Sequence, residues 1–328
     1  MCRRHGHLPC SAYDMTRKLI IDCDPGIDDA VALTLALFDP RLEIVAITAC
    51  SGTVDAARST QNLQAIVELL DPPRHPRLGA ARDPEDAPVS DGSDLHGADG
   101  LGNVQLQPIG RQHVMPSDKL IADRLKADPG EVSLLCLGPL TGVASAFRRD
   151  PSLIDMVDRI VIVGGTSHGI GDVTAASEFN MHFDPSSATT IFRSPTTKTM
   201  LPLEITDQVA FGLELLEALP TKHSRAGRLL HGILPHYFRM LRQHRARETV
   251  SLQAAVGVMA ILEPGLMATE EVSVDIEEHG RLTRGATVID RRAFARQRKD
   301  VELVTAIDAE ATREAIIRGL KFAGQQTE

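Results

Sequence analysis

The sequence predicts an α/β fold in which a single open, mostly parallel but mixed sheet is flanked by helices. Short apolar, β-branched runs alternate with helical segments over most of the chain, which is the pattern of βαβ units. Turn residues, among them several glycines and prolines, close many of these runs. The 328 residues show no internal repeat and no long linker, so they suit one large domain.

The first four elements lie near the N-terminus. Residues 18–22 (KLIID) are short and apolar and are followed by a turn, as in a buried strand. The helix predicted at 28–38 carries carboxylates in its first turn, where the helix dipole favours negative charge. The β-branched run 42–49 is typical of a strand, and the helix predicted at 55–70 ends before the Asp-Pro-Pro stop signal at 71–73.

The middle of the chain repeats this alternation. The same patterns predict strands at 132–137, 159–163 and 199–203 and helices at 141–147 and 185–192. Between residues 71 and 113 the sequence is rich in Pro, Gly and Asp and has the weakest regular structure. A long loop in a compact domain is usually functional. We therefore expect residues 83–103 to form a mobile or poorly packed loop over a ligand-binding pocket.

After residue 211 the sequence becomes helical and then mixed. It predicts helices at 225–247, 252–262 and 309–320 and late strands at 271–276, 287–289 and 301–306. Met15 stands just before the first strand, which indicates a natural start there. We therefore expect a disordered extension at residues 1–14 and one α/β domain at residues 15–322.

Charge and composition argue against several classes of protein. The formal net charge of −9 makes nucleic acid or an anionic membrane an unfavourable partner. No apolar run reaches the ~18 residues of a membrane span, and the N-terminus lacks the apolar region of a secretion signal. The five cysteines are odd in number, scattered and without a CxxC pair, which favours reduced thiols. We therefore expect a cytoplasmic protein.

Four carboxylates lie within residues 22–29 (DCDPGIDD), around a Pro-Gly turn between a predicted strand and a predicted helix. In open α/β sheets, ligands bind beyond the carboxyl ends of the strands. Because four like charges this close repel one another, we expect a divalent cation with oxygen ligands to neutralise them. Helix capping by Asp28 and Asp29 would account for one or two of the four. An EF-hand is excluded, since its sixth and twelfth positions would be Ile27 and Leu33.

The carboxylate cluster is also part of a longer pattern. Residues 20–30 (IIDCDPGIDDA) resemble the N-terminal signature of the inosine-uridine-preferring nucleoside hydrolases. Further segments resemble that family in the same order and at similar spacing: 96–102 (HGADGLG), 138–141 (GPLT), 163–165 (VGG), 178–180 (EFN) and 184–185 (DP). Together they cover roughly residues 16–264 and are more specific than any single motif.

This resemblance implies a nucleoside hydrolase-like fold and hydrolysis of the N-glycosidic bond of ribonucleosides to ribose and free base. It implies a Ca²⁺ cofactor held by Asp24, by Asp29 and by the backbone carbonyl of Leu137. Asp24 would also be the base that activates a metal-bound water. The resemblance implies further residues that bind the substrate, namely Asp28, His96, Asp172, Glu178, Asn180 and Gln253. It also implies a homodimer or homotetramer that acts on a small nucleoside.

Elementary chemistry agrees with these roles. Ca²⁺ accepts about six to eight oxygen ligands, so vicinal hydroxyls and water can complete its shell. A bound cation lowers the pKa of its water, and a nearby carboxylate can then take the proton. Glycosidic cleavage passes through an oxocarbenium-like state, which a carboxylate-rich pocket stabilises.

The sequence departs from the family pattern at three places. Thr53 follows Gly52 where the family usually has Asn, and Asp172 replaces another Asn. Near the start of the C-terminal apolar helix, Gln253 and Ala254 stand where the family has an adjacent His and Asp. In the family that Asp completes the metal site, and in many members the His protonates the leaving base.

These last two replacements remove chemical groups. Ala254 offers no side-chain oxygen, so we expect weaker Ca²⁺ binding, and an insertion that shifts this alignment is the alternative. The amide of Gln253 donates a hydrogen bond but cannot deliver a proton, so the leaving base needs help from elsewhere. Candidates to replace the lost groups are Tyr237 and His236 at the base and Glu248 or Asp207 at the metal.

Two rival functions remain open on the sequence. A family member that binds a nucleoside or ribose without turnover would explain Gln253 and Ala254, although the four retained carboxylates argue for a cation. A phosphatase of the haloacid-dehalogenase type shares the Asp-x-Asp after a strand and a later Gly-Asp at 171–172. It lacks the expected Thr or Val after the second Asp and does not explain the EFN and HGADGLG segments. Hydrolysis of ribonucleosides is therefore the leading hypothesis.

Overall fold

The structure is a computed structural model that describes residues 16–84, 86, 88, 92–106, 108, 114–292 and 299–328. The extension expected at residues 1–14 lies outside the described residues. None of the helices in the described ranges combines the length and the hydropathy that crossing a membrane requires.

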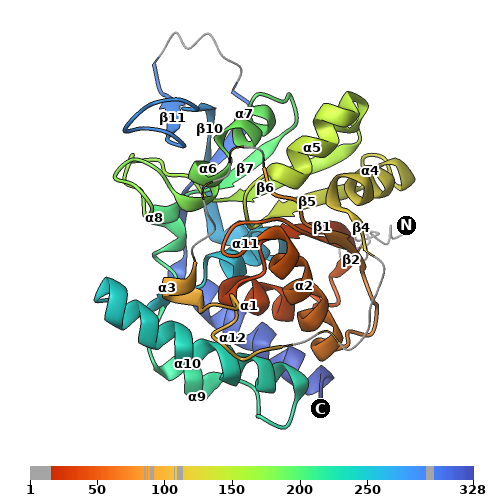
Figure 1. Ribbon diagram of the computed structural model, residues 1–328, viewed down its shortest axis with the longest axis vertical. Coiled ribbons are helices and arrows are strands. Elements are labelled where there is room, and N and C mark those ends of the chain that lie inside the picture. The colour runs from red at the N-terminus through yellow and green to blue at the C-terminus, as the bar shows by residue number, and fades with distance from the viewer. Residues whose placement is uncertain are drawn as a thin grey trace, which may run out of the picture.

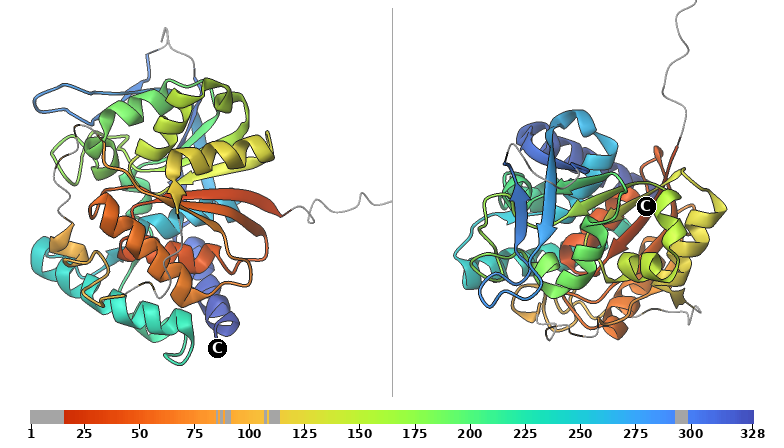
Figure 2. Two further views of the ribbon diagram at one scale, coloured as in Figure 1. Left: turned by 45° about the vertical axis from the view of Figure 1, so that its right-hand side comes forward. Right: turned by 90° about the horizontal axis from the view of Figure 1, so that it is seen from above.

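Ten strands of the described chain form one open sheet in the order β11-β10-β12-β7-β6-β5-β1-β2-β3-β4 (Figures 1 and 2). All neighbours from β12 to β4 pair in parallel, whereas β10 pairs antiparallel with β12 and with β11. The predicted open, mostly parallel, mixed sheet is confirmed. Its strands are β1 (Arg17–Cys23), β2 (Leu42–Ala49), β3 (Arg77–Ala80), β4 (Met115–Pro116), β5 (Val132–Cys136), β6 (Val157–Val163), β7 (Lys198–Leu201), β10 (Met267–Ile276), β11 (Thr287–Asp290) and β12 (Val301–Ile307).

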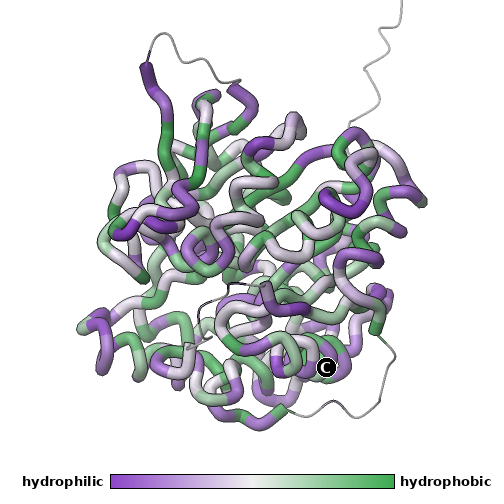
Figure 3. Tube along the Cα trace, turned by 45° about the horizontal axis from the view of Figure 1, so that its top comes forward, coloured by the Kyte–Doolittle hydropathy of each residue, from purple (hydrophilic) through white to green (hydrophobic). Residues whose placement is uncertain are grey.

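Helices cover both faces of this sheet (Figure 2). One face packs against α1 (Ile27–Ala36), α2 (Ala56–Leu70), α10 (Arg225–Arg245), α11 (Gln253–Leu262) and α12 (Ala309–Gln326), and the other against α4 (Ser117–Ala127), α5 (Thr141–Arg149) and α7 (Pro185–Phe192). Because successive strand side chains point to opposite faces, Leu19 and Ile21 of β1 join the first core and Ile20 joins the second. Along the outer helices, hydrophobic residues alternate with hydrophilic ones (Figure 3).

Short elements connect these layers. They are α3 (Ser93–His96), α6 (Phe179–Phe183), α8 (Leu203–Thr206), α9 (Glu214–Ala218), the 3₁₀ segments Pro151–Asp155 and Pro264–Leu266, and the antiparallel pair β8 (Ala210–Phe211) and β9 (Val250–Ser251). Three of them, α3, α6 and α8, lie in the segments that follow the parallel strands β3, β6 and β7 (Figure 1).

The predictions fail mainly where elements are short. The strand expected at 199–203 ends at Leu201, because Pro202 has no N–H to donate and Leu203 already begins α8. The strands β3 and β4 were not predicted, since four and two residues carry no periodic signal.

The loop expected to be poorly packed is ordered in its described part. Residues 93–96 form α3, and the carboxylate of Asp99 accepts hydrogen bonds of 2.8, 2.8 and 2.9 Å from the N–H groups of Leu101, Asn103 and Gln105. Leu101 is buried in the first core. An Asp that closes several turns in this way stabilises a Gly-rich segment that composition alone marks as loose.

Candidate active site

A cavity of about 640 Å³ lies beyond the carboxyl ends of the parallel strands. Its wall includes Asp24, which follows β1, Leu137, which follows β5, and Val163 at the end of β6. The first turns of α1 and α11 also line it, through Asp29 and Gln253. This is the place at which open α/β sheets bind their ligands.

Asp24 lies in the turn between β1 and α1, and Thr53 holds its carboxylate. The N–H and the hydroxyl of Thr53 donate hydrogen bonds of 2.8 and 2.9 Å to Oδ2 of Asp24. Asp24 is buried, and burial raises the pKa of Asp24 to about 6, although these hydrogen bonds oppose the rise. Thr53 stands where the family usually has Asn, so this departure marks a residue that positions the carboxylate.

Two glycines leave room for the same carboxylate. A Cβ atom added to Gly138 would lie 2.5 Å from Oδ1 of Asp24 and 2.8 Å from the sulfur of Cys50, and one added to Gly52 would clash with Oδ2. Both glycines follow strands, Gly52 after β2 and Gly138 after β5. The backbone therefore approaches Asp24 so closely that a side chain at either position would displace it.

Asp28 and Asp29 form the first turn of α1, and each keeps one oxygen without a partner among the described residues. Oδ2 of Asp29 accepts a 3.2 Å bond from the N–H of Gly26, and Oδ2 of Asp28 accepts a 2.8 Å bond from the N–H of Ala254. Both Oδ1 atoms are buried and unpaired. Burial raises the pKa of Asp28 to about 7, and burial together with the charges of Asp24 and Asp28 raises the pKa of Asp29.

Asp22 does not line the cavity, which corrects the view of four carboxylates around one cation. Its side chain points to the same face of the sheet as that of Ile20, two residues earlier, and Oδ1 accepts a 2.5 Å hydrogen bond from the hydroxyl of Thr48 on β2. Burial raises the pKa of Asp22 to about 7. Asp22 therefore lies within the sheet on the face of Ile20, whereas Asp24 lies beyond the end of β1, in the turn that leads to α1.

Asn180 connects two strand ends at the cavity wall. Its Nδ2 atom donates hydrogen bonds of 2.9 and 3.0 Å to the carbonyls of Leu137 and Val163. A carbonyl oxygen has two lone pairs, so the Leu137 carbonyl keeps one for a further ligand. Asn180 thereby fixes the carbonyl that the family resemblance assigns to the metal.

Glu178 is the N-cap of α6 and is buried beside Asn180. Its carboxylate accepts hydrogen bonds of 2.8, 2.9 and 3.2 Å from the N–H groups of Gly165, Asn180 and Met181. Burial, followed by the nearby charge of Asp172, raises the pKa of Glu178 to about 8. Glu178 lines the cavity, but both of its oxygens already bind the backbone.

His96 ends α3, and its ring reaches the first turn of α1. Nδ1 of His96 accepts a 3.1 Å hydrogen bond from the N–H of Ile27, and the ring centroid lies 5.3 Å from that of Tyr237. Burial, and then the charge of His236, lower the pKa of His96 to about 4. The ring is therefore neutral near pH 7 and presents an Nε2–H donor.

The remaining predicted substrate residues also line the cavity. Oδ1 of Asp172 accepts a 3.0 Å bond from the N–H of Phe179, while Gln253 and Ala254 begin α11. Ala254 is 4% exposed and presents only its methyl group as a side chain. The structure thus brings all nine predicted site residues to the wall of one cavity. They are Asp24, Asp28, Asp29, His96, Leu137, Asp172, Glu178, Asn180 and Gln253.

Two of the four candidates to replace the lost family groups reach this cavity. Tyr237 and Asp207 line it, and Asp207 pairs with Arg247 at 3.2 Å while its Oδ1 stays buried without a partner in the described chain. His236 does not line it and instead packs against the loop at Gly102. Glu248 lines a second cavity of about 870 Å³ beside α9 and α10. Helix periodicity alone could not separate Tyr237 from its neighbour His236.

The donor atoms fit a hard cation. Asp24, Asp29 and the carbonyl of Leu137 offer only oxygens, and Oδ1 of Asp29 is buried without a partner in the described ranges. Within those ranges, however, no three His, Cys, Asp or Glu side chains form a group that could hold a metal alone. Since Ala254 presents no side-chain oxygen, a cation here would need the carbonyl, water and substrate to complete its ligands.

Comparison with known proteins identifies the family to which the chain belongs. The sequence profile of the family described as inosine-uridine preferring nucleoside hydrolase matches residues 19–314. The chain belongs to this family. A nucleoside hydrolase of this name from Leishmania major is 33% identical over 285 residues, which cover 85% of the present chain and 89% of the relative. One from Crithidia fasciculata is 29% identical over 316 residues, covering 94% and 99%.

The structural comparison agrees with the sequence comparison. A solved plant nucleoside hydrolase matches the present nucleoside hydrolase with a TM-score of 0.83 at 28% identity, covering 94% of this chain and 99% of the other. The motif resemblance and the enzyme class that it implied are therefore confirmed. The family match also continues past residue 264, where the motifs end, through β10 and β12.

Proposed function

We propose that this nucleoside hydrolase uses Ca²⁺ to hydrolyse the N-glycosidic bond of ribonucleosides to ribose and a free purine or pyrimidine base. The observation that carries the proposal is the placement of Asp24. Thr53 holds its carboxylate through two hydrogen bonds, and Gly52 and Gly138 leave the space that it occupies at the cavity wall. A carboxylate fixed in this way is suited to take the proton of an attacking water molecule.

The residues around Asp24 have matching tasks in this proposal. The water oxygen adds to C1′ of the ribose and gives its proton to Asp24, while the electron pair of the glycosidic bond passes to the base. Asp28 and Asn180 would bind the ribose hydroxyls, since Oδ1 of Asp28 is buried without a partner in the described chain and Asn180 lines the same wall. Held in this way, the sugar presents C1′ to the water.

Asp24, Asp29 and the carbonyl of Leu137 would hold the Ca²⁺. When bound, the ion supplies positive charge that polarises water and neutralises the carboxylates. Asn180 would keep this carbonyl in place, because its Nδ2 atom donates a hydrogen bond to the oxygen of Leu137.

The substrate class is proposed from the relatives and from the size of the cavity. Two relatives are named for inosine and uridine, and one from Salmonella enteritidis, 30% identical over 310 residues, is named a non-specific ribonucleoside hydrolase. About 640 Å³ lies within the range of small-molecule sites. The chain has no Trp, so stacking on the base would rely on Tyr237 and His96. We propose that both purine and pyrimidine ribonucleosides are accepted.

The test is hydrolysis of inosine and uridine by the purified protein, followed by release of reducing sugar. We expect Asp24→Asn to lower kcat by about 10³-fold or more, because the base is lost while the side-chain shape is kept. Chelation by EGTA should abolish activity, and added Ca²⁺ should restore it. Full activity of the Asp24→Asn variant, or of the chelated protein, would contradict the proposal.

Gln253 and Ala254 favour a second candidate function, binding of a nucleoside or ribose without turnover. Both residues line the cavity, so the loss of the family His and Asp affects the site itself. Calorimetric titration with inosine separates the two functions. Heat of binding without release of hypoxanthine at saturating Ca²⁺ would favour the binder.

We also propose that the protein is a cytoplasmic homodimer or homotetramer, as the family resemblance implies. Light scattering behind a size-exclusion column would measure the mass of the particle against the 35.5 kDa of one chain. A mass that stays at one chain over a wide concentration range would contradict this assembly.

A further inference from the structure

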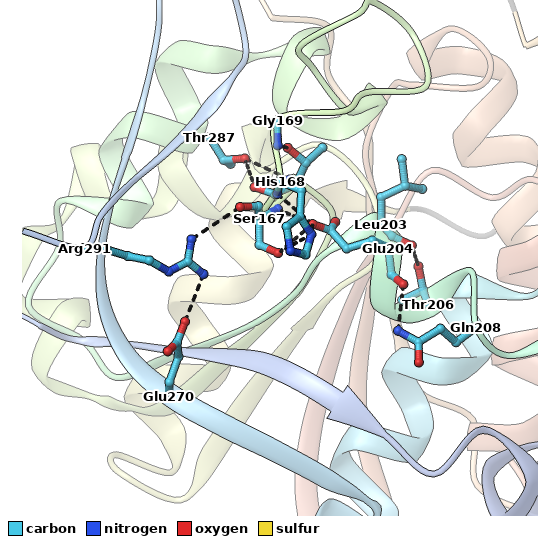
Figure 4. Close-up of polar contacts among 11 residues, drawn as sticks. Ser167, His168, Gly169, Leu203, Glu204, Thr206, Gln208, Glu270, Thr287 and Arg291 are labelled. Atoms are coloured by element: carbon cyan, nitrogen blue, oxygen red, sulfur yellow. Dashed lines mark hydrogen bonds and ion pairs between the residues drawn. The ribbon is translucent and has the colours of Figure 1, made fainter.

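We propose that His168 is the acid that protonates the leaving base and that Glu204 positions its imidazole. This inference rests on the proposed hydrolysis of ribonucleosides and names a proton donor in place of Gln253. His168 lies in the segment between β6 and α6, and it lines the same cavity as Asp24 and Gln253. Figure 4 shows it beside Glu204 of α8.

Other polar groups of the cavity are poorer proton donors. His96 is already neutral near pH 7, since its Nδ1 accepts a backbone hydrogen bond and its pKa is lowered to about 4. Burial raises the pKa of the Tyr237 hydroxyl above its ordinary value. Arg245 and Arg247 also line the cavity, but a guanidinium group is a hydrogen-bond donor rather than a general acid. Glu178 has a raised pKa, but both of its oxygens accept hydrogen bonds from backbone N–H groups.

Glu204 fixes the ring of His168 from one side (Figure 4). Its Oε1 atom lies 2.8 Å from Nδ1 of His168 and accepts bonds of 2.7 and 2.6 Å from the N–H and hydroxyl of Ser167. Burial alone would raise the pKa of Glu204, but the hydrogen bonds from Ser167 and His168 outweigh burial and lower it. An ionised Glu204 accepts the Nδ1 proton. When the ring is the imidazolium, Nε2, which has no partner in the described chain, carries the second proton and can donate it to a ligand.

The pair lines the same cavity as Gln253, which stands at the position of the family acid. α8, which carries Glu204, packs against α11, which begins with Gln253. Ile170 and Val173 follow His168 in the same segment, line the cavity and are 73% and 45% exposed. An apolar cover of this kind suits the flat face of a base, and a base placed against it would lie next to the imidazole.

The segment is anchored so that His168 keeps its place. Thr166 donates a 2.8 Å hydrogen bond from its N–H to the hydroxyl of Thr287 on β11, and that hydroxyl donates one of 2.5 Å to the Thr166 carbonyl. Arg291 donates a 3.5 Å bond to the carbonyl of Ser167 and pairs with Glu270 at 3.0 Å (Figure 4). Residues at the sheet edge therefore support the backbone immediately before His168.

The proton balance of the step is simple. As the bond between C1′ and the base nitrogen breaks, its electron pair goes to the base, and the Nε2 proton of His168 passes to a ring nitrogen of the base. Water adds to C1′ and gives its proton to Asp24. Solvent then returns one proton to His168 and takes one from Asp24, so the net reaction consumes one water molecule and releases ribose and neutral base.

The test compares a natural leaving group with one that needs no protonation. We expect His168→Gln and His168→Ala to lower kcat/KM for inosine by about 10²-fold or more, while hydrolysis of p-nitrophenyl β-D-ribofuranoside changes by less than about threefold. Glu204→Gln should lower kcat/KM for inosine by about tenfold and leave hydrolysis of the nitrophenyl riboside nearly unchanged, because the imidazole of His168 is then held less firmly. His223→Ala, at an exposed position away from the cavity, is the matched control and should leave both substrates unaffected.

The failure of this inference differs from the failure of the proposed function. If the parent enzyme hydrolyses inosine and the His168 variants are unchanged, or lose both substrates equally, His168 is not the acid. If the parent enzyme hydrolyses neither substrate with Ca²⁺ present, the proposed function falls and this inference falls with it. Retained hydrolysis of the nitrophenyl riboside also shows that the variants are folded.

Discussion

The backbone N–H of Ala254 donates a 2.8 Å hydrogen bond to Oδ2 of Asp28, a residue 226 positions earlier in the chain. This bond joins the N-terminus of α11 to the first turn of α1. Free N–H groups at a helix N-terminus favour a carboxylate, so α11 stabilises the ionised form of Asp28. Because the donor is the backbone, the bond does not depend on the side chain at position 254.

Ala254→Asp should restore a third carboxylate at the site. We expect Ca²⁺ to bind about tenfold more tightly, because a further anionic oxygen compensates its charge. Without metal the new carboxylate lies near Asp28 and Asp29, so the midpoint of thermal unfolding should fall. Titration calorimetry with Ca²⁺ and thermal unfolding in EGTA measure the two effects. Ala254→Asn has nearly the same shape without the charge, and equal Ca²⁺ affinities of the two variants would refute this expectation.

Gly138→Ala should reduce activity through Asp24. The added methyl group would lie 2.5 Å from Oδ1 of Asp24 and 2.8 Å from the sulfur of Cys50, so the carboxylate must move. We expect kcat for inosine to fall by about 10²-fold, since small displacements of a reacting group are costly. Gly265→Ala is the matched control, because a Cβ atom there meets nothing within 4 Å. Equal kcat values for both variants would show that Asp24 tolerates the shift.

In the absence of metal, the free energy of unfolding should fall as the pH rises from about 5 to 8. Burial raises the pKa values of Asp22 and Asp28 from 3.8 to about 7 in the folded chain. An acid whose pKa is raised by folding contributes stability that is complete below its unfolded pKa and is lost as the pH passes through its folded pKa. Urea unfolding in EGTA at several pH values measures the slope. Asp22→Asn should make the free energy of unfolding depend less on pH. A free energy of unfolding that rises with pH in the parent protein would contradict the prediction.

His96→Ala should weaken both the fold and substrate binding. The change leaves the N–H of Ile27 without its 3.1 Å acceptor and removes a ring that lies 5.3 Å from that of Tyr237. We expect a loss of about 1–2 kcal/mol in the free energy of unfolding and a several-fold rise in KM for inosine. His75→Ala, at an exposed position, is the control for loss of a histidine. An unchanged KM would place His96 outside the base-binding wall.

The sequence predicted long elements well and short ones poorly. The bounds of β2 and α7 match the expected ranges, because a clear hydrophobic periodicity over eight residues fixes where each element begins and ends. The short elements β3, β4 and α8 were not predicted, because they form where neighbouring strands and loops supply their hydrogen bonds. The Asp99 turns show the same limit, as the composition of a Gly-rich segment does not reveal which carboxylate closes it.

By itself the sequence determined the alternation of strands and helices, the carboxylate-rich turn after the first strand and the replacement of the family His and Asp by Gln253 and Ala254. These are properties of residues close together in the chain, so hydrophobic periodicity, turn residues and the spacing of motifs are enough to predict them. Only the tertiary structure decided that Asp22 points away from the cavity, that Thr53 holds Asp24 from 29 positions away, and that His168 shares a cavity with Gln253. Such contacts join segments that approach one another only when the sheet is assembled, so no local pattern specifies them.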